Sequence, residues 1–269
     1  MRRAPVGVVK AALVAGQVTL SRVRRSPTRA GHRILCYHRV SPARDQLAVT
    51  PARFRRQLDV IEGSGLPVVD VMRFARGETM PPSSIALTFD DGYADLLEYA
   101  HPELARRGWP AIVFVVPEAV EGHVRFPWYR GHQPRLISWA EMIDVERDGL
   151  TRFEPHSLTH APLSSLSAED AWREIAGSRR AVADALGREP EMFCYPGGYH
   201  GERETGFVER AGYTAAVSCE YGVNDRDQDR FALRRIPVDR YDRTWTMAGR
   251  LRGATDRPPP LRRPRSEAA

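Results

Sequence analysis

The sequence predicts an α/β fold in which a parallel sheet closes into a barrel within a single domain. From about Gly31, short apolar runs alternate steadily with helical stretches, and no repeat or linker interrupts residues 31–245. Several runs are apolar at nearly every position, which is typical of strands buried on both faces. Strands that alternate with helices indicate βα units and a parallel sheet. For a chain of 269 residues, we expect this sheet to close into a barrel, with the active site on the loops that follow the strands.

The individual elements follow from local patterns. Apolar, β-branched and aromatic runs predict strands at 33–38, 66–71, 84–89, 111–117, 151–156, 191–196, 214–219 and 233–238. Periodic stretches predict helices at 54–65, 94–108, 138–149, 167–186 and 202–211. Ser138 and Glu141 form a capping box at the start of one helix, and Gly187 ends the helix over 167–186.

The composition excludes several classes of protein. A hydrophobic fraction of 42% supports a sizeable core, whereas 28% charged residues and a mean hydropathy of −0.44 exclude a polytopic membrane protein. The net charge is +6 and comes almost wholly from arginine, since Lys10 is the only lysine. Aromatic residues are not interleaved with the arginines, so we expect no nucleic-acid partner. Three scattered cysteines make neither a disulfide framework nor a CxxC zinc site, so a metal would need His, Asp and Glu.

Basic segments flank the predicted domain. Residues 1–30 form a basic extension whose apolar stretch is interrupted and too short to span a membrane, with no clear signal-peptide cleavage site. Arginines beside this stretch favour a helix on an anionic membrane surface. We therefore expect a cytoplasmic or membrane-peripheral protein, with the cell envelope as the alternative. Residues 31–250 form the domain, and the proline- and arginine-rich tail 251–269 is expected to be disordered.

The first chemical motif is TFDDGY (88–93), at the end of a predicted strand. Asp90 and Asp91 are adjacent, and Gly92 permits a turn that lets both carboxylates reach one cavity. Two carboxylates in one cavity titrate apart unless a cation neutralises one of them. One aspartate would then bind the cation while the other stays free as a base. The alternative is an ordinary Asp-Gly turn.

The second motif is EPHSLTH (154–160), after another predicted strand. His156 and His160 are four residues apart, the spacing that puts two imidazoles on one face of a helical turn. With one aspartate they form a His, His, Asp set that suits zinc or a similar divalent ion and leaves positions open for water and substrate. No HExxH glutamate is present, so Asp90 is the base by elimination.

TFDDG followed by H-S-x-x-H resembles the polysaccharide deacetylases (NodB-like, carbohydrate esterase family 4). His156 lies 65 residues after Asp91 (156 − 91), a separation that the resemblance demands. CYHRV (36–40) and FCYPGGYH (193–200) are similar to a branch with YHxV and FxYPxG motifs. The resemblance covers most of the chain. It implies a distorted (β/α) barrel of the NodB type and metal-dependent hydrolysis of acetyl groups on N-acetylated sugars of a polysaccharide or related glycan.

The resemblance also implies roles for single residues. Asp90 would be the general base, and the metal ligands would be Asp91, His156 and His160. The metal would most simply be Zn²⁺, with Co²⁺, Ni²⁺ and Mn²⁺ as alternatives. In the third motif, Tyr195 and Pro196 would contact substrate, and the backbone N–H of Gly197 would stabilise the oxyanion. Ser157 would shape the ligand turn by hydrogen bonding.

The sequence departs from the family pattern at two places. Cys194 stands where well-known members have an arginine that tethers the base, and Arg235 or Arg234 would take over that tether. The fifth motif offers no histidine as general acid, which leaves His38, His132, His200 or Asp90 itself. A non-catalytic carbohydrate-binding barrel and a glycan O-acetyl esterase are therefore alternatives to an N-deacetylase. The oligomeric state is open.

Overall fold

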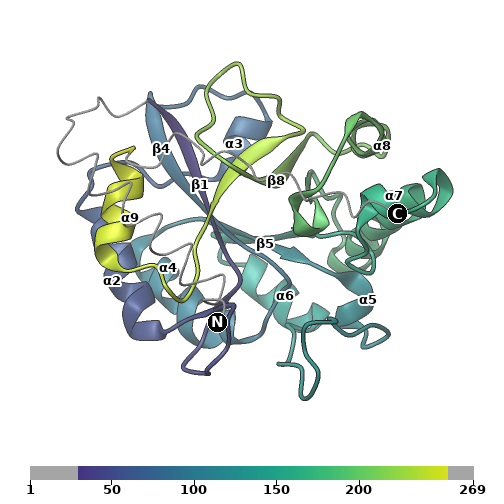
Figure 1. The fold of residues 1–269 in the computed structure, drawn as a ribbon, viewed down its shortest axis with the longest axis horizontal. Coiled ribbons are helices and arrows are strands. Elements are labelled where there is room, and N and C mark those ends of the chain that lie inside the picture. The colour runs from purple at the N-terminus through teal and green to yellow at the C-terminus, as the bar shows by residue number, and fades with distance from the viewer. Residues whose placement is uncertain (1–29, 254–269) are drawn as a thin grey trace, which may run out of the picture.

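A parallel seven-stranded sheet, in the order β6-β5-β4-β1-β9-β8-β7, forms the centre of the molecule (Figure 1). This computed structural model describes residues 30–253. The predicted membrane-surface helix and nearly all of the predicted disordered tail lie outside these residues. The strands of the sheet are β1 (Gly31–Tyr37), β4 (Ser83–Phe89), β5 (Ala111–Val115), β6 (Thr151–Pro155), β7 (Met192–Cys194), β8 (Ala215–Tyr221) and β9 (Leu233–Pro237). The expected parallel α/β barrel is confirmed.

Helices surround this sheet, and a small parallel pair, β2 (Arg39–Val40) and β3 (Ala48–Val49), follows β1. The helices are α2 (Pro51–Glu62), α3 (Val71–Ala75), α4 (His101–Arg107), α5 (Pro117–Val120), α6 (Trp139–Glu146), α7 (Ala168–Leu186), α8 (Glu202–Arg210) and α9 (Thr244–Leu251). The capping box of Ser138 and Glu141 is present, and Gly187 ends α7 in the left-handed conformation, as predicted. Across residues 30–253, each helix is too short or too polar to cross a membrane.

The period of two along each strand divides the core into layers. Alternate side chains from six strands meet in one buried cluster inside the barrel, which includes Ile34, Ala86, Ile112, Phe114, Val217 and Leu233. The intervening side chains, such as Leu35 and Phe89, pack outward into a second cluster with the helices. The central strands β1, β4 and β5 are therefore buried on both faces, which explains their apolar runs.

Two predicted elements differ in the structure. The run 66–71 is not a strand: Val68 makes a single bridge to Ile85, and Asp70 then caps α3 by accepting a hydrogen bond from the Met72 N–H. The predicted helix 94–108 begins as a π-helical turn over Leu96–Ala100 before α4. Pro102 has no N–H to donate into a regular helix and its ring crowds the preceding turn, which accounts for the irregular start.

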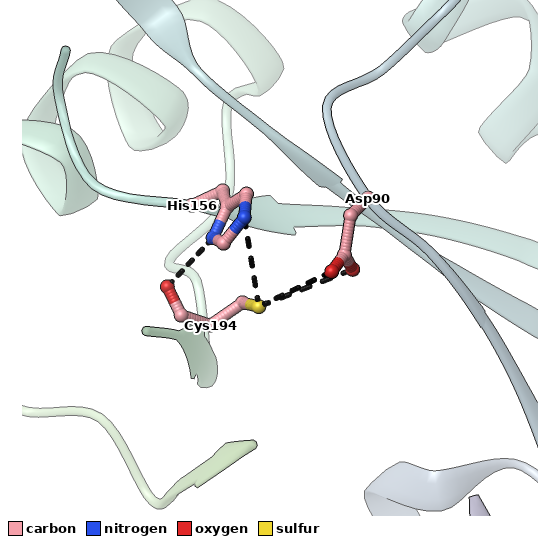
Figure 2. A group of neighbouring side chains, drawn as sticks. All are labelled: Asp90, His156 and Cys194. Atoms are coloured by element: carbon pink, nitrogen blue, oxygen red, sulfur yellow. Dashed lines mark hydrogen bonds between the residues drawn. The ribbon is translucent and has the colours of Figure 1, made fainter. Parts of the chain in front are cut away.

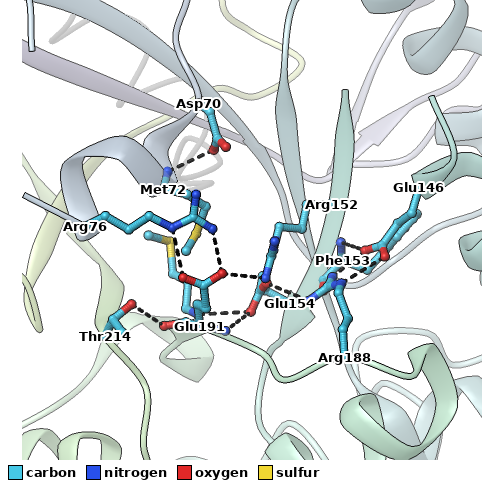
Figure 3. A network of polar contacts seen from close by, with 11 residues as sticks. Asp70, Met72, Arg76, Glu146, Arg152, Phe153, Glu154, Arg188, Glu191 and Thr214 are labelled. Atoms are coloured by element: carbon cyan, nitrogen blue, oxygen red, sulfur yellow. Dashed lines mark hydrogen bonds and ion pairs between the residues drawn. The ribbon is translucent and has the colours of Figure 1, made fainter. Parts of the chain in front are cut away.

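The barrel is closed by side chains between its two end strands, β6 and β7 (Figure 3). Buried Glu154 of β6 accepts hydrogen bonds from the backbone N–H groups of Glu191 (2.8 Å) and Met192 (3.0 Å) at the start of β7. The guanidinium groups of Arg152 and Arg188 also donate to Glu154, at 2.6 and 3.1 Å. We call this junction the β6–β7 seam. At this seam, the contacts of the buried Glu154 carboxylate take the place of the backbone hydrogen bonds that would join two paired strands.

Candidate active site

The candidate site lies at the carboxyl ends of the strands. Asp90 and Asp91 directly follow β4, His156 directly follows β6, and Cys194 is the last residue of β7. Figure 2 shows Asp90, His156 and Cys194 pointing toward one another from three separate segments. All three side chains are buried. Residues distant in the sequence thus converge at one end of the barrel, where a (β/α) barrel carries its chemistry.

The three residues predicted to bind metal face one another. The Oδ1 atom of Asp91 lies 3.9 Å from Nε2 of His156 and 3.7 Å from Nε2 of His160. The two imidazole rings are 4.8 Å apart and nearly perpendicular. These nitrogens and this oxygen lie too far apart for direct hydrogen bonds but close enough to share one ion.

Unusual backbone conformations build this arrangement. Within residues 30–253, the non-glycine residues with positive φ are Asp91 (70°), Ser157 (60°) and His160 (65°), all at the site. The expected helical turn between His156 and His160 is therefore wrong, because Ser157 and His160 adopt left-handed conformations that a helix excludes. As predicted, the Ser157 hydroxyl shapes the loop, accepting a hydrogen bond from the His160 N–H at 3.0 Å. Such strain persists only where the surroundings enforce it.

His156 is held in the tautomer that a metal ligand requires. Its Nδ1 lies 2.8 Å from the carbonyl oxygen of Cys194, which accepts the Nδ1 proton. Burial, with the neighbouring His160 as the next cause, lowers the pKa of His156 to about 3. The ring is therefore neutral at pH 7, and the lone pair on Nε2 faces Asp91. A hydrogen bond of this kind orients the ring and raises its basicity as a ligand.

Asp91 lacks the partner that a buried carboxylate needs. Its Oδ1 atom is buried and accepts no hydrogen bond. Burial and then the charge of Asp90 raise the pKa of Asp91 well above its usual value, although a hydrogen bond from Tyr93 opposes them. A divalent cation would supply the missing partner, and two neutral imidazoles with one carboxylate suit Zn²⁺ or a similar ion. The donor set therefore fits a metal.

Asp90 is paired with Arg235 instead. The guanidinium Nη1 and Nη2 atoms donate to the two carboxylate oxygens at 2.7 and 2.8 Å, and both side chains are buried. Burial raises the pKa of Asp90, but Arg235 outweighs this effect, so the pKa lies well below its usual range. Of the two arginines proposed as a tether, Arg235 makes the contact, whereas Arg234 lies 3.7 Å from Glu220. Asp90, His156 and Cys194 also group closely, but Arg235 occupies both oxygens of Asp90.

The three candidates for a general acid lie in different surroundings. His38 directly follows β1, is half-buried, and its charge acts on both Asp90 and His160. His132 is exposed, and His200 stacks on Tyr195 with ring centroids 4.6 Å apart. Of these three candidates, His38 is therefore the one whose charge acts on Asp90 and His160.

The third motif differs from its predicted role. Tyr195 is fully buried and its hydroxyl donates to the Phe231 carbonyl at 3.0 Å, so its side chain offers no surface to a sugar. Pro196 is buried as well. The predicted substrate contacts of these two side chains are therefore wrong. Gly197 is the exposed residue of this turn, and its φ of 63° is a conformation that glycine adopts without strain.

The family model for polysaccharide deacetylases matches residues 77–216, which include the Asp90–Asp91 pair, both histidines and the third motif. The chain belongs to the polysaccharide deacetylase family. Among curated proteins, "Putative polysaccharide deacetylase YxkH" of Bacillus subtilis (strain 168) is 25% identical over 209 residues, which cover 76% of this chain and 70% of that protein.

Solved structures show that the deacetylase fold extends through most of the chain. IcaB from Ammonifex degensii is similar with a TM-score of 0.71 at 21% identity, covering 83% of this chain and 97% of that chain. The Streptococcus pyogenes deacetylase PplD, solved in complex with acetate, gives a TM-score of 0.69 at 21% identity, covering 82% and 97%. At this identity the likeness concerns the fold, a nearly closed parallel barrel with surrounding helices.

Two further features of the deacetylase site were missed by sequence reasoning. Glu174 of α7 anchors the histidine loop, accepting hydrogen bonds from the N–H groups of Leu158 (3.0 Å) and Thr159 (2.9 Å). Glu174 is one of several charged residues on this amphipathic helix, so the sequence gives no signal of this role. Trp128 lies edge-on to His160, with ring centroids 5.1 Å apart, and donates to the Tyr93 hydroxyl at 3.2 Å. The aromatic cluster around Trp128 in the sequence was a usable signal.

Proposed function

We propose that this deacetylase hydrolyses the N-acetyl groups of a glycan and depends on a divalent metal, most simply Zn²⁺. The observation that carries the proposal is the buried, unpartnered Asp91 Oδ1, faced by two imidazole nitrogens beside the Asp90–Arg235 pair. A divalent ion held by Asp91, His156 and His160 would lower the pKa of water and polarise the acetyl carbonyl. Co²⁺, Ni²⁺ and Mn²⁺ are alternative ions for the same three ligands.

Asp90 is the proposed general base. Arg235 keeps Asp90 ionised and fixes both of its carboxylate oxygens. Asp90 can therefore accept a proton next to Asp91, the proposed metal ligand. The same ion pair lowers the basicity of Asp90. A base of this kind can take a proton only from a water whose pKa is also lowered, as a bound metal ion would do. As the water adds to the acetyl carbon, its proton passes to Asp90.

The remaining groups complete the reaction. The backbone N–H of Gly197 is the proposed donor to the oxyanion, since it lies in the exposed turn after Cys194, whose carbonyl binds His156. His38 is the proposed acid that gives a proton to the leaving amine, because its charge acts on both Asp90 and His160. Breaking the C–N bond then releases acetate and a free amino sugar.

Acetate release tests the proposal. The chain is incubated with N-acetylglucosamine oligomers and with O-acetylated xylan, as purified, after chelation, and after reloading with each metal. We expect release from the N-acetylated oligomers that chelation abolishes and Zn²⁺ restores. Release from the xylan alone would identify an O-acetyl esterase, and binding without release would identify a non-catalytic barrel. Release that chelation leaves unchanged would contradict the metal role.

A further inference from the structure

A concave, positively charged cleft of about 400 Å³ lies between α2 and α9, outside the candidate active site. Its lining residues are Arg53, Arg56, Arg243, Thr244 and Trp245. The first two belong to the first two turns of α2, whereas the others belong to the start of α9 and the residue before it. Two segments nearly 200 residues apart in the sequence thus bring three arginines to one hollow.

In the part of the chain that the structure describes, no carboxylate neutralises the charge of this cleft. On other faces arginines pair with carboxylates, as in Arg76–Glu191 (2.6 Å) and Arg173–Asp170 (2.8 Å). Within residues 30–253, no carboxylate forms an ion pair with the three arginines of the cleft, and Arg53 donates instead to the Arg240 carbonyl. Like charges gathered in a hollow repel one another and focus a positive potential. An anion in the cleft would relieve that repulsion.

An exposed aromatic ring lines the same cleft, and a second exposed ring lies close to it in the sequence. Trp245 lines it and is 37% exposed, and the nearby Tyr241 is 38% exposed. The Arg240 guanidinium lies over the Tyr241 ring, 5.7 Å from its centroid. An exposed aromatic ring offers an apolar face with a polar edge. A sugar presents a flat C–H face to such a ring, so a ring beside three arginines suits a sugar that carries negative charge.

The two helices that line the cleft begin at the same end of the barrel as the active site. α2 begins shortly after β1 and the small β2–β3 pair, and α9 begins shortly after β9, so both helices start near the carboxyl ends of the strands. Arg235 of β9, which binds Asp90, lies only eight residues before Arg243 (243 − 235). A glycan chain that reaches the metal ligands can therefore extend along this edge toward the cleft.

We propose that this cleft binds an anionic substituent, a carboxylate or a phosphate, on the glycan whose acetyl group is hydrolysed. The inference rests on the proposed function and adds a substrate class, an acidic N-acetylated glycan. The guanidinium fork matches the two oxygens of a carboxylate or phosphate, and three arginines line the hollow in which such a group would lie.

Binding measurements test the cleft independently of turnover. The full-length chain and an Arg56→Gln/Arg243→Gln variant are titrated at low salt with a heparosan octasaccharide, which carries carboxylates, and with a glycerol phosphate oligomer. A neutral N-acetylglucosamine hexamer is the ligand control. Arg55→Gln is the matched protein control, since Arg55 is exposed on the same helix but does not line the cleft. We expect the double variant to raise the Kd of one anionic probe about tenfold or more.

The outcomes separate this inference from the proposed function. Weaker binding of heparosan assigns a carboxylate and weaker binding of the phosphate oligomer assigns a phosphate, provided that Arg55→Gln and the neutral hexamer show no change. Equal affinity of the wild type and the double variant for both anionic probes overturns the inference. So does a loss seen only with phosphatidylglycerol vesicles, which would make the cleft a lipid contact. Absence of acetate release would refute the hydrolysis but leave these affinities readable.

Discussion

Replacing Arg235 by glutamine tests the buried ion pair that holds Asp90. Both side chains are buried, with the guanidinium 0% and the carboxylate 2% exposed, and two hydrogen bonds of 2.7 and 2.8 Å join them. Removing one partner leaves a buried carboxylate without its counter-charge, which costs about 3–5 kcal/mol. We therefore expect Arg235→Gln to lower the free energy of unfolding at pH 7 by about that amount.

The pH dependence of this loss has a definite sign. In the wild type, Arg235 keeps the pKa of Asp90 below its unfolded value of 3.8, so the pair stabilises the fold above that pH and the contribution fades as the pH falls. In Arg235→Gln, burial raises the pKa of Asp90, so protonation at low pH removes the buried charge. The difference in unfolding free energy between the wild type and the variant should shrink as the pH falls from 7 to about 4.

Equilibrium unfolding in urea at both pH values measures these quantities. An Asp90→Asn/Arg235→Gln double variant completes a mutant cycle and should cost clearly less than the two single changes together, because neither charge is left alone. If Arg235→Gln is hard to purify, the double variant should still be no less stable than Asp90→Asn alone, in which Arg235 is left buried without its partner. A loss below about 1 kcal/mol at pH 7, or a difference that widens as the pH falls, would refute the assigned pairing.

Four other substitutions test the site and the fold. Asp90→Asn should retain the metal and lower turnover by about 10²–10⁴-fold, whereas Asp91→Asn should shed the metal; metal content with acetate release checks both, and the reverse pattern would exchange the two roles. Glu174→Gln should weaken metal affinity by about 10–100-fold in a chelator competition, because the histidine loop loses its carboxylate anchor; an unchanged affinity would exclude that role. Ser138→Ala should cost about 1 kcal/mol in urea unfolding and leave acetate release unchanged, and a loss of activity would contradict its purely structural role.

The sequence was sufficient to locate the chemical residues but not their conformations. Asp90, Asp91 and His156 could be predicted because strand ends in a parallel barrel meet on one face. The left-handed conformation of His160 could not, since it depends on the loop around it, which Glu174 holds from a distant helix. A four-residue spacing by itself is compatible with either a helical turn or this loop.

The choice between the two arginines shows the same limit. Strand periodicity puts Arg234 and Arg235 on opposite faces, but the flanking residues are apolar on both sides, so the sequence does not say which face meets Asp90. The structure decides because Arg235 shares the inner face with Leu233, and the carboxylate lies at the end of that face. Tyr195 was misplaced for a related reason: a motif gives the order of its side chains but not which are covered.

The β6–β7 seam would couple binding of the proposed metal to the closure of the barrel. Since side chains join β6 to β7, the barrel can widen there without breaking any strand pairing. One of these closures is the hydrogen bond from His156 to the Cys194 carbonyl, so the residue that orients toward the ion also joins the two strands. An ion bound to His156 would therefore stabilise this seam, and opening the seam would move a proposed metal ligand. The local opening equilibrium of this seam would therefore determine both the stability of the junction and the affinity for the ion.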